Sequence, residues 1–305
     1  MTEKQPHIVV TGASGFIGTH VMQALAAAGE YPVGLCRKPT KGLVHGFDLM
    51  EMGDLSKVLS GAKAVVHCAA RVHSKEDPKT ELDDHRKANR DGTADLLRQA
   101  EAAGVQHFVF LSTVAVYGLQ KASEVIALNY PSAPNTAYGQ AKLEAEAIVQ
   151  ACPMRSTILR VPLVYGPHAP GNWRKLMRLC QSGYPLPFGF VGNRRSMIAV
   201  QNLADLIRHC LQSDDTPEVI LATDHDDLGT TRICTELRKA MGKPRRLFAV
   251  PKPLMSAGAT LVRRPYLYEQ LFESLQFSAT DCGWTPPLTA DQALHLCVTG
   301  TAAGK

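Results

Sequence analysis

Short apolar runs alternate with amphipathic stretches through the first half of the chain. The runs, each of which is predicted to form a strand, lie at 7–11, 31–37, 64–69, 107–113 and 155–161. The longest stretches between them, 85–104 and 137–152, have the apolar spacing of helices. Because the strands are apolar on both faces, helices must cover both sides of the sheet. The alternation therefore predicts an α/β fold built on a doubly wound parallel sheet.

The alternation weakens after residue 165. Proline and glycine cluster in "YGPHAPGN" and "GYPLPFGFVGN", which is typical of loops. Helical spacing returns near 172–182, 202–212, 230–241 and 289–298. We therefore expect a larger sheet domain over residues 1–165 and a smaller second lobe over residues 166–305.

Composition and charge exclude several classes of protein. The net charge of the 305-residue chain is only +5 and no long basic run is present, which argues against nucleic-acid binding. The longest apolar stretch, 253–262, falls short of the roughly 20 residues that a membrane span needs. The eight cysteines show no metal-ligand spacing, and the first residues lack an apolar leader. We expect a cytoplasmic protein with reduced thiols and no metal centre.

Three glycines in "VTGASGFIGTH" follow the first predicted strand and open the first predicted helix. In this context Gly12 permits a tight turn, Gly15 lets the backbone approach a pyrophosphate, and Gly18 permits close helix–strand packing. The free N–H groups of the helix terminus favour an anion. A glycine-rich turn without a ligand is the alternative. The strand–loop–helix context favours dinucleotide binding in a Rossmann-type fold, with Phe16 and Ile17 completing the loop.

The end of the second predicted strand indicates which dinucleotide binds. An acidic residue there accepts the ribose 2′-hydroxyl of NAD, whereas an arginine accommodates the 2′-phosphate of NADP. This chain has Cys36 in place of the acid, followed by Arg37 and Lys38. The alternative is a solvated pair of basic side chains. We therefore expect NADP(H) rather than NAD(H), with Asp48 and Leu49 as weaker contacts in the next loop.

Hydroxyl and amine side chains predict acid–base chemistry in the same domain. Tyr138 and Lys142 are four residues apart and share one face of a helix. A nearby ammonium lowers the pKa of a tyrosine and makes it a better acid–base group at neutral pH. Ser112 and Thr113 end a predicted strand, at the edge where ligands bind in doubly wound sheets. A surface Tyr–Lys pair and hydroxyls that merely cap a turn are the alternatives.

These motifs occur together with "HCAA", "NRDGT", "LSTVAVYG" and "RVPLVYGP", in that order along the chain. The set resembles the extended short-chain dehydrogenases/reductases of the NAD-dependent epimerase/dehydratase type over nearly the whole chain. The resemblance implies that Thr113 polarises a carbonyl oxygen, that Tyr138 is the acid–base residue and that Lys142 is its partner. It implies further cofactor contacts at His67, Ala69, Ala70 and Asn89, and dimerisation through helices 84–104 and 135–151.

The second lobe carries a resemblance to nucleotide-sugar members of that family. In "NRRSMIAVQNLADLI" (193–207), Arg195 falls where such members bind a diphosphate, and a structural role for Arg195 is equally supported. Asn172 and Ser112 are further candidate substrate contacts. Gln270 stands where many members have an arginine, so a second phosphate contact is not expected.

The resemblance implies NADPH-dependent reduction of the C4 keto group of a nucleotide sugar, with UDP as the nucleotide. The alternative is an NAD-dependent UDP-hexose 4-epimerase, which uses the same residues. A non-enzymatic, cofactor-sensing protein on this fold is a third class. The complete set of Thr113, Tyr138 and Lys142 argues against it.

Overall fold

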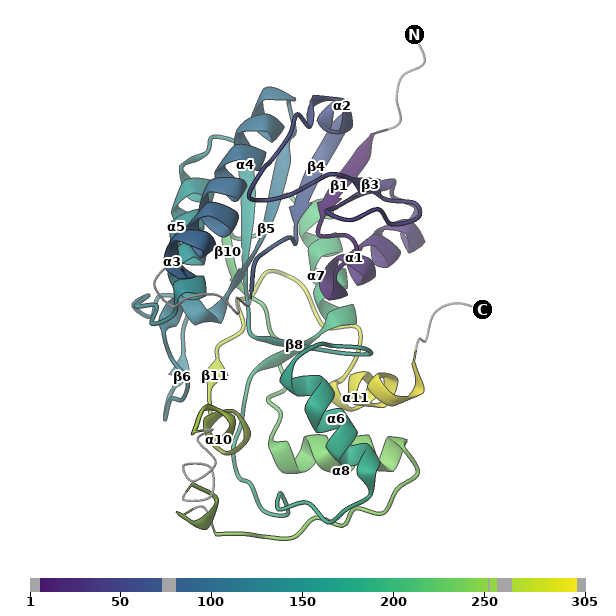
Figure 1. Ribbon diagram of the computed structural model, residues 1–305, viewed down its shortest axis with the longest axis vertical. Coiled ribbons are helices and arrows are strands. Elements are labelled where there is room, and N and C mark those ends of the chain that lie inside the picture. Colours follow the sequence, from purple (N-terminus) through teal and green to yellow (C-terminus); the bar gives the residue numbers. More distant parts are fainter. Residues whose placement is uncertain (1–5, 73–80, 252, 257–264, 301–305) are drawn as a thin grey trace.

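A seven-stranded parallel sheet forms the centre of the larger domain in the computed structural model, which describes residues 6–72, 81–251, 253–256 and 265–300 (Figure 1). In spatial order its strands are β10 (Val219–Leu221), β7 (Arg155–Val161), β5 (His107–Thr113), β4 (Ala62–His67), β1 (His7–Thr11), β2 (Pro32–Cys36) and β3 (Val44–His45). The chain runs outward from β1 in both directions, so the order reverses beside β1. That reversal is where doubly wound sheets bind ligands.

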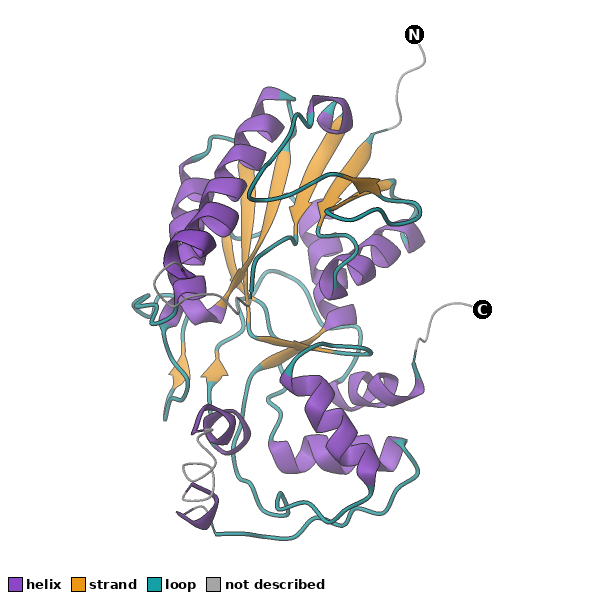
Figure 2. Ribbon diagram, in the orientation of Figure 1, coloured by secondary structure: helices purple, strands orange, loops and turns teal. Residues whose placement is uncertain are grey.

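Helices cover both faces of the sheet (Figure 2). One face packs on α1 (Phe16–Ala27) and α7 (Val200–Gln212), and the other on α4 (Gly92–Ala102) and α5 (Ala137–Ala151). Strand β1 shows why both faces must be covered. Ile8 and Val10 pack in the core formed with α1 and α7, whereas Val9 points to the other face and packs in the core formed with α4 and α5. The predicted fold, with strands that are apolar on both faces, is confirmed.

The smaller lobe is built from short elements around a separate apolar core. Its helices are α6 (Asn172–Ser182), α8 (Thr230–Ala240), α10 (Pro265–Phe272) and α11 (Ala290–Thr299). Two small parallel sheets pair β8 (Leu163–Tyr165) with β9 (Met197–Ala199) and β6 (Val125–Ile126) with β11 (Gln276–Phe277). Three of the four helices predicted after residue 165 lie in this lobe.

Some elements differ from the prediction. Helix α7 and strand β10 lie beyond residue 165, yet they pack on the sheet of the larger domain. The helix predicted over 85–104 is instead α3 (Glu81–His85), a π-helical turn η1 (Arg86–Asp91) and α4. Two shorter helices, α2 (Ser56–Leu59) and the 3₁₀ turn η2 (Val114–Tyr117), complete the larger domain. None of the described helices is long and apolar enough to cross a membrane.

The first strand and the first helix approach each other closely at Gly18. A Cβ atom at this position would lie 2.2 Å from the carbonyl oxygen of Gly12 and 2.8 Å from its carbonyl carbon. Both atoms belong to the backbone of the turn, so no side-chain rotation relieves the clash. The entry of the chain into α1 therefore requires glycine here.

We expect Gly18→Ala to lower the free energy of unfolding by about 1–3 kcal/mol, although alanine is the better helix former, because the added methyl group overpacks the turn. Gly53→Ala is the matched control, since a Cβ at this exposed glycine meets nothing within 4 Å. Urea unfolding of both variants measures the difference. Equal effects of the two substitutions would contradict the packing argument.

Candidate functional site

The glycine loop leaves backbone N–H groups available for an anion. Gly12 adopts a φ of +66°, and the turn closes with a 2.8 Å hydrogen bond from the Gly15 N–H to the Gly12 carbonyl oxygen. Helix α1 then begins without a side-chain cap and without an acidic residue in its first turn. Phe16 and Ile17 turn their side chains into the cores of the second lobe and the larger domain, respectively. The loop therefore fits the pyrophosphate of a dinucleotide.

The end of β2 presents cations to solvent and no carboxylate. Cys36 is buried, and its thiol donates a 3.0 Å hydrogen bond to the carbonyl oxygen of Lys38. Arg37 and Lys38 are exposed. In the next loop, the Asp48 carboxylate accepts a 2.9 Å hydrogen bond from the Met50 N–H. That contact ties the Asp48 carboxylate to its own loop, whereas Arg37 and Lys38 are exposed directly after β2.

A chain of hydrogen bonds fixes the protonation of His67 at the end of β4. The Thr11 hydroxyl accepts from the Ala69 N–H at 3.2 Å and so donates to His67 Nδ1 at 2.7 Å. On the other side, the Thr93 hydroxyl donates to the Asn89 carbonyl oxygen at 2.6 Å and so accepts from His67 Nε2 at 3.1 Å. Burial lowers the pKa of His67 well below its usual value. The ring is therefore neutral and holds the segment that includes Ala69.

Asn89 fastens the segment after β4 to the π-helical turn. Its side-chain oxygen accepts from the Arg71 N–H at 2.8 Å, and its amide group donates to the Arg71 carbonyl oxygen at 2.9 Å and to His85 Nδ1 at 3.2 Å. Asn89 is buried, whereas Ala69 and Ala70 remain partly exposed beside the glycine loop. Asn89 thus holds the main chain that follows Ala69 and Ala70, and so supports the predicted cofactor site without being exposed to it. π-Helical turns are common at functional sites.

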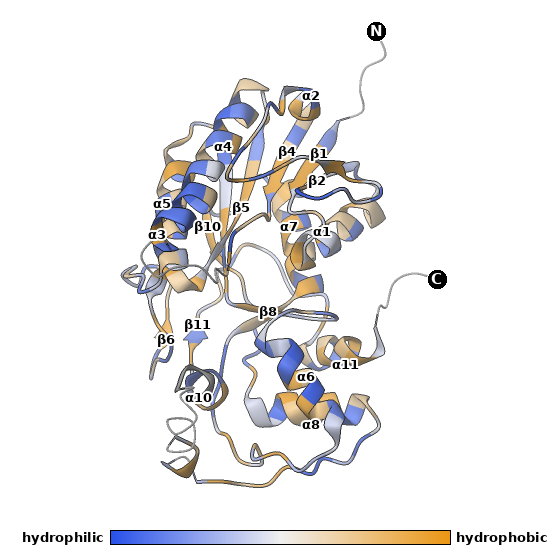
Figure 3. Cartoon of the chain, viewed as in Figure 1, coloured by the Kyte–Doolittle hydropathy of each residue, from blue (hydrophilic) through white to orange (hydrophobic). Residues whose placement is uncertain are grey.

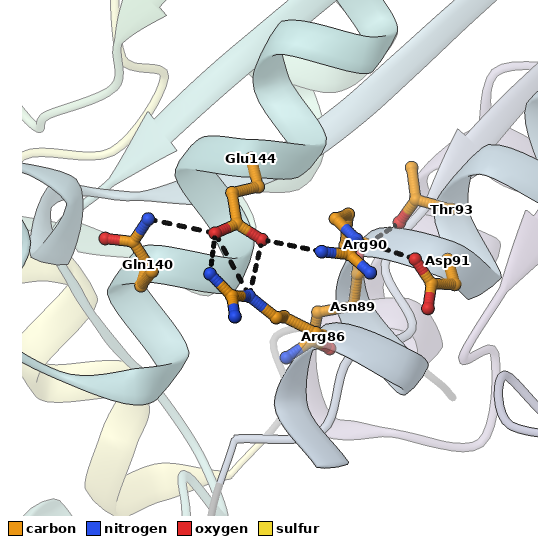
Figure 4. Close-up of polar contacts among 7 residues, drawn as sticks. All are labelled: Arg86, Asn89, Arg90, Asp91, Thr93, Gln140 and Glu144. Carbon is orange, nitrogen blue, oxygen red and sulfur yellow. Dashed lines mark hydrogen bonds and ion pairs between the residues drawn. The ribbon is translucent and has the colours of Figure 1, made fainter. Parts of the chain in front are cut away.

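A charged cluster ties this turn to α5 (Figure 4). Arg86 donates to both oxygens of Glu144, with Nη2–Oε1 at 2.6 Å and Nε–Oε2 at 2.9 Å. Arg90 and Gln140 add contacts to the same carboxylate at 3.2 and 2.9 Å. The hydrogen bonds from Arg86 are the main cause that lowers the pKa of Glu144 to about 2. The cluster fixes α5 relative to the turn that carries Asn89.

Tyr138 and Lys142 project from the first half of α5, which Thr136 caps by accepting from the Gly139 N–H at 3.1 Å. The Tyr138 ring meets His85 edge-on at 6.0 Å, and burial raises the pKa of Tyr138 to about 12. Lys142 is 1% exposed, and its Nζ lies 3.8 Å from the centroid of the Phe110 ring. Burial lowers the pKa of Lys142 to about 7.

The expected lowering of the Tyr138 pKa by Lys142 is not found in this structure. Loss of hydration is the sole cause that acts on the phenol, and it acts in the opposite direction. The Lys142 amine lies over the Phe110 ring of β5. Tyr138 is therefore protonated at neutral pH and is suited to donate a proton.

The two hydroxyls at the end of β5 face different surroundings. The Thr113 oxygen accepts from the Ala115 N–H at 3.1 Å and caps η2, so its proton remains able to donate. Ser112 is buried and donates to the Glu146 carboxylate. Successive side chains of a strand point to opposite faces, which explains the difference. The Ser112 hydroxyl thus serves an interior carboxylate, and its contact with substrate stays a prediction.

Glu146 is the centre of a buried polar network beneath the catalytic candidates. Its side chain is 2% exposed, and the Arg160 guanidinium donates to it from Nη2 at 2.7 Å and from Nε at 3.1 and 3.2 Å. Arg160 also donates to the Tyr117 hydroxyl at 2.9 Å, which donates to the Leu128 carbonyl oxygen at 3.0 Å. Sequence reasoning missed this network, although Glu146 one helical turn after Lys142 was a visible signal.

In the second lobe, Arg195 and Asn172 have protein partners. Arg195 Nη1 donates to the carbonyl oxygens of Gln120, Glu269 and Glu273 at 3.3, 3.3 and 3.0 Å. Asn172 donates to the Gln270 side chain at 2.7 Å. These contacts match the structural alternative for Arg195, because they join the loop after η2 to helix α10.

Comparison with known proteins agrees with this geometry. Residues 8–223 match the model of the NAD dependent epimerase/dehydratase family. The chain belongs to this family. The resemblance inferred from the ordered motifs is thereby confirmed, and the chain is an enzyme of an NAD(P)-dependent family. No candidate metal cluster occurs among the described residues.

One curated relative and two solved structures are similar to most of the chain. A UDP-glucose 4-epimerase of Vibrio cholerae is 32% identical over 93% of this chain and 92% of its own length. The structure of a UDP-N-acetylglucosamine 4-epimerase from Bacillus cereus superposes with a TM-score of 0.75 at 19% identity, covering 97% of this chain and 100% of that one. RMD from Pseudomonas aeruginosa, complexed with NADPH, superposes with a TM-score of 0.70 at 21% identity, covering 97% and 98%.

The burial of Lys142 predicts a specific pH dependence of stability. The pKa of Lys142 is about 7 in the folded chain and, by reference values, about 10.4 in the unfolded chain. The unfolded chain therefore binds more protons in this window, and the contribution of Lys142 to stability rises with pH. We expect Lys142→Met to stabilise the fold more at pH 7 than at pH 9, with its advantage over the native chain smaller by about 2 kcal/mol at pH 9.

Denaturant unfolding at several pH values measures this difference. Lys121→Met, at an exposed lysine, is the control and should show no such pH trend. A Lys142→Met advantage that does not change between pH 7 and pH 9 would contradict the assignment.

Proposed function

We propose that the chain catalyses NADPH-dependent reduction of the C4 keto group of a nucleotide sugar, with UDP as the nucleotide. The observation that supports the chemistry best is Tyr138, a protonated phenol of α5 that lies one helical turn before Lys142, whose Nζ lies over Phe110 of β5. When bound there, the dinucleotide supplies the hydride. The chain itself must bind the two substrates, orient the carbonyl group and deliver a proton.

Each catalytic candidate has a role that its surroundings allow. Tyr138 donates the proton to the developing alkoxide, which is the standard task of a positioned acid. Thr113 donates a hydrogen bond to the same oxygen and stabilises its growing charge. Lys142, whose pKa is lowered to about 7 by burial, gains its proton readily when an anionic or hydroxyl-bearing ligand enters the site. Its positive charge then supports the loss of the proton from Tyr138.

The end of β2 supports NADPH as the reductant. A carboxylate at position 36 would repel a 2′-phosphate, and the buried thiol of Cys36 does not. Arg37 and Lys38 are exposed beside it, and guanidinium groups bind phosphates through paired, charge-assisted hydrogen bonds. Ala69 and Ala70 form the neighbouring wall of the proposed site, and the buried side chains of His67 and Asn89 support that segment from the interior. Asp48 and Leu49 belong to the loop that faces it across the sheet edge.

A 4-epimerase is the second candidate, and the full-length similarity to the UDP-glucose 4-epimerase of Vibrio cholerae favours it. An epimerase removes and returns the hydride within one turnover, so it retains NAD and gains nothing from cations at the end of β2. The same tyrosine then acts first as a base. The two candidates differ in whether NADPH is consumed.

We propose that the substrate lies between the sheet edge and the second lobe. Asn172, at the start of α6, is the proposed contact from the lobe. Of the two roles left open for Arg195, we propose the structural one, because its Nη1 is held by three carbonyl groups. A cytoplasmic location is part of the proposal because NADPH is the reductant.

A homodimer through α4 and α5 is also proposed. Between these helices lies a groove of about 440 Å³, lined by Ala94, Leu97, Ala147 and Ile148 among others. Small apolar side chains on two adjacent helices are suited to pack against a second copy of the same pair.

The function is tested by incubating the protein with a UDP-4-keto sugar and NADPH. We expect one NADPH oxidised per 4-hydroxy sugar formed, and Tyr138→Phe should lose about 10²–10⁴-fold in turnover while its NADPH affinity is retained. Tyr31→Phe, at an exposed tyrosine, is the matched control. Copurified NAD together with UDP-hexose epimerisation and no NADPH consumption would reject reduction and establish the second candidate.

The cofactor preference gives a separate prediction. We expect Arg37→Gln to weaken NADPH binding about tenfold or more, because one charge-assisted contact is lost, and to leave NADH binding unchanged. Arg98→Gln, at a largely exposed arginine of α4, is the control. Fluorescence titration of both cofactors measures the effect. An equal loss for NADPH and NADH would show that Arg37 does not contact the 2′-phosphate.

A further inference from the structure

Two loops of the second lobe pair along its outer edge. Residues 184–190 follow α6 and residues 245–248 follow α8, and we call them together the distal ribbon. The Leu186 N–H donates to the Arg246 carbonyl oxygen, the Phe248 N–H to that of Leu186, and the Gly189 N–H to that of Phe248, at 3.0, 3.0 and 2.9 Å. In Figure 1 both loops run along the lower edge, at the end of the long axis opposite α2.

A buried arginine holds the ribbon in one conformation. Arg238 of α8 is 0% exposed, and its guanidinium donates to the carbonyl oxygens of Arg245 at 2.7 Å, Arg246 at 3.2 Å and Tyr184. Among the described residues, its hydrogen-bond partners are all main-chain carbonyls. Arg246 adopts a φ of +34°, a costly conformation for a side-chain-bearing residue that the surrounding contacts must impose. The ribbon is therefore a built feature of the lobe.

The ribbon turns aromatic rings into solvent. Leu186 and Phe188 enter the core of the lobe, whereas Phe190, Tyr184 and Phe248 are 85%, 75% and 48% exposed. Leu254, shortly after the ribbon, is 65% exposed. Exposed aromatic rings contribute no burial of apolar surface to the stability of the fold. Several exposed apolar side chains on one short segment therefore indicate an interaction surface.

The charged residues of the ribbon itself, within 184–190 and 245–248, are all basic. Arg245 and Arg246 of the ribbon are exposed, as are Arg174, Lys175 and Arg178 of the preceding helix α6. Figure 3 shows hydrophilic and apolar colours following one another along the lower loop. The second lobe therefore presents cations beside its exposed rings.

We propose that the distal ribbon docks the enzyme on an anionic lipid surface. Aromatic rings partition into the interface between headgroups and acyl chains, and flanking lysines and arginines bind acidic headgroups. Such a surface attracts Arg245 and Arg246 together with the exposed cations of α6, and this attraction orients the molecule with the ribbon toward the lipid. An acidic protein would satisfy the cations, but it would leave outward aromatic rings without an apolar layer to enter.

The proposal is tested by sedimenting the full-length protein with vesicles of phosphatidylcholine alone and of phosphatidylcholine mixed equally with phosphatidylglycerol. We expect binding to the anionic vesicles only, weakened by salt. Phe190→Ser/Phe248→Ser and Arg245→Gln/Arg246→Gln should each reduce the bound fraction about tenfold or more, since both apolar and ionic contacts contribute. Tyr31→Ser and Arg98→Gln, which alter an exposed ring and an exposed arginine of the other domain, should bind as the native protein does.

The ribbon variants require a check that they are folded, and several results would reject the proposal. Unchanged thermal unfolding and unchanged cofactor affinity would establish that the ribbon variants are folded, so their loss of vesicle binding is attributed to the surface. Absence of vesicle binding, equal binding to both vesicle types, or equal losses in the controls would each reject lipid docking. Self-association in solution that the ribbon variants abolish would assign the surface to a second copy, and duplex DNA binding that they abolish would assign it to nucleic acid.

Discussion

The buried pair of Glu146 and Arg160 determines where the catalytic helix lies. Two opposite charges without water attract strongly only if their geometry is maintained, and loss of either partner leaves the other unpaired at high cost. The pair joins α5 to β7, Ser112 extends it to β5, and Tyr117 extends it to the turn that Thr113 caps. Lys142 and Tyr138 lie on the same helix one and two turns before Glu146, respectively, so their distance from the sheet edge is set from within the core.

A second set of polar contacts performs the same task on the opposite side of the site. The chain from Ala69 through Thr11, His67 and Thr93 to Asn89 has one consistent direction of donors. His67 is thus held neutral with its proton on Nε2. It positions the backbone beside the glycine loop without itself changing charge. Both sides of the site therefore depend on residues that cannot touch a ligand, which is how a fold maintains a reactive geometry on rigid elements.

Sequence patterns predicted those parts of the fold that depend on residues close together along the chain. The alternation of apolar runs and helices predicted the parallel sheet, and the strand–glycine–helix context predicted the turn between β1 and α1, for which dinucleotide binding stays a prediction. Contacts between distant segments were beyond such patterns. The carbonyl groups that hold Arg195 lie more than 70 residues away, the burial that raises the Tyr138 pKa depends on His85 and the sheet, and β10 is only three residues long. Strand geometry predicts that Ser112 and Thr113 point to opposite faces of the sheet. Which of the two points into the interior could be decided only from the position of Glu146, which accepts a hydrogen bond from Ser112.

Phe16 connects the glycine loop of the larger domain to the core of the second lobe. It is the first residue of α1, directly after the loop whose N–H groups face the phosphate site, yet its side chain packs into the core of the second lobe and lies beside Gly166. The Phe16 ring is thus fixed in the second lobe, whereas its backbone belongs to α1 of the larger domain. A rotation of the second lobe about the sheet would therefore also move the amino end of α1, because Phe16 packs in the core of that lobe.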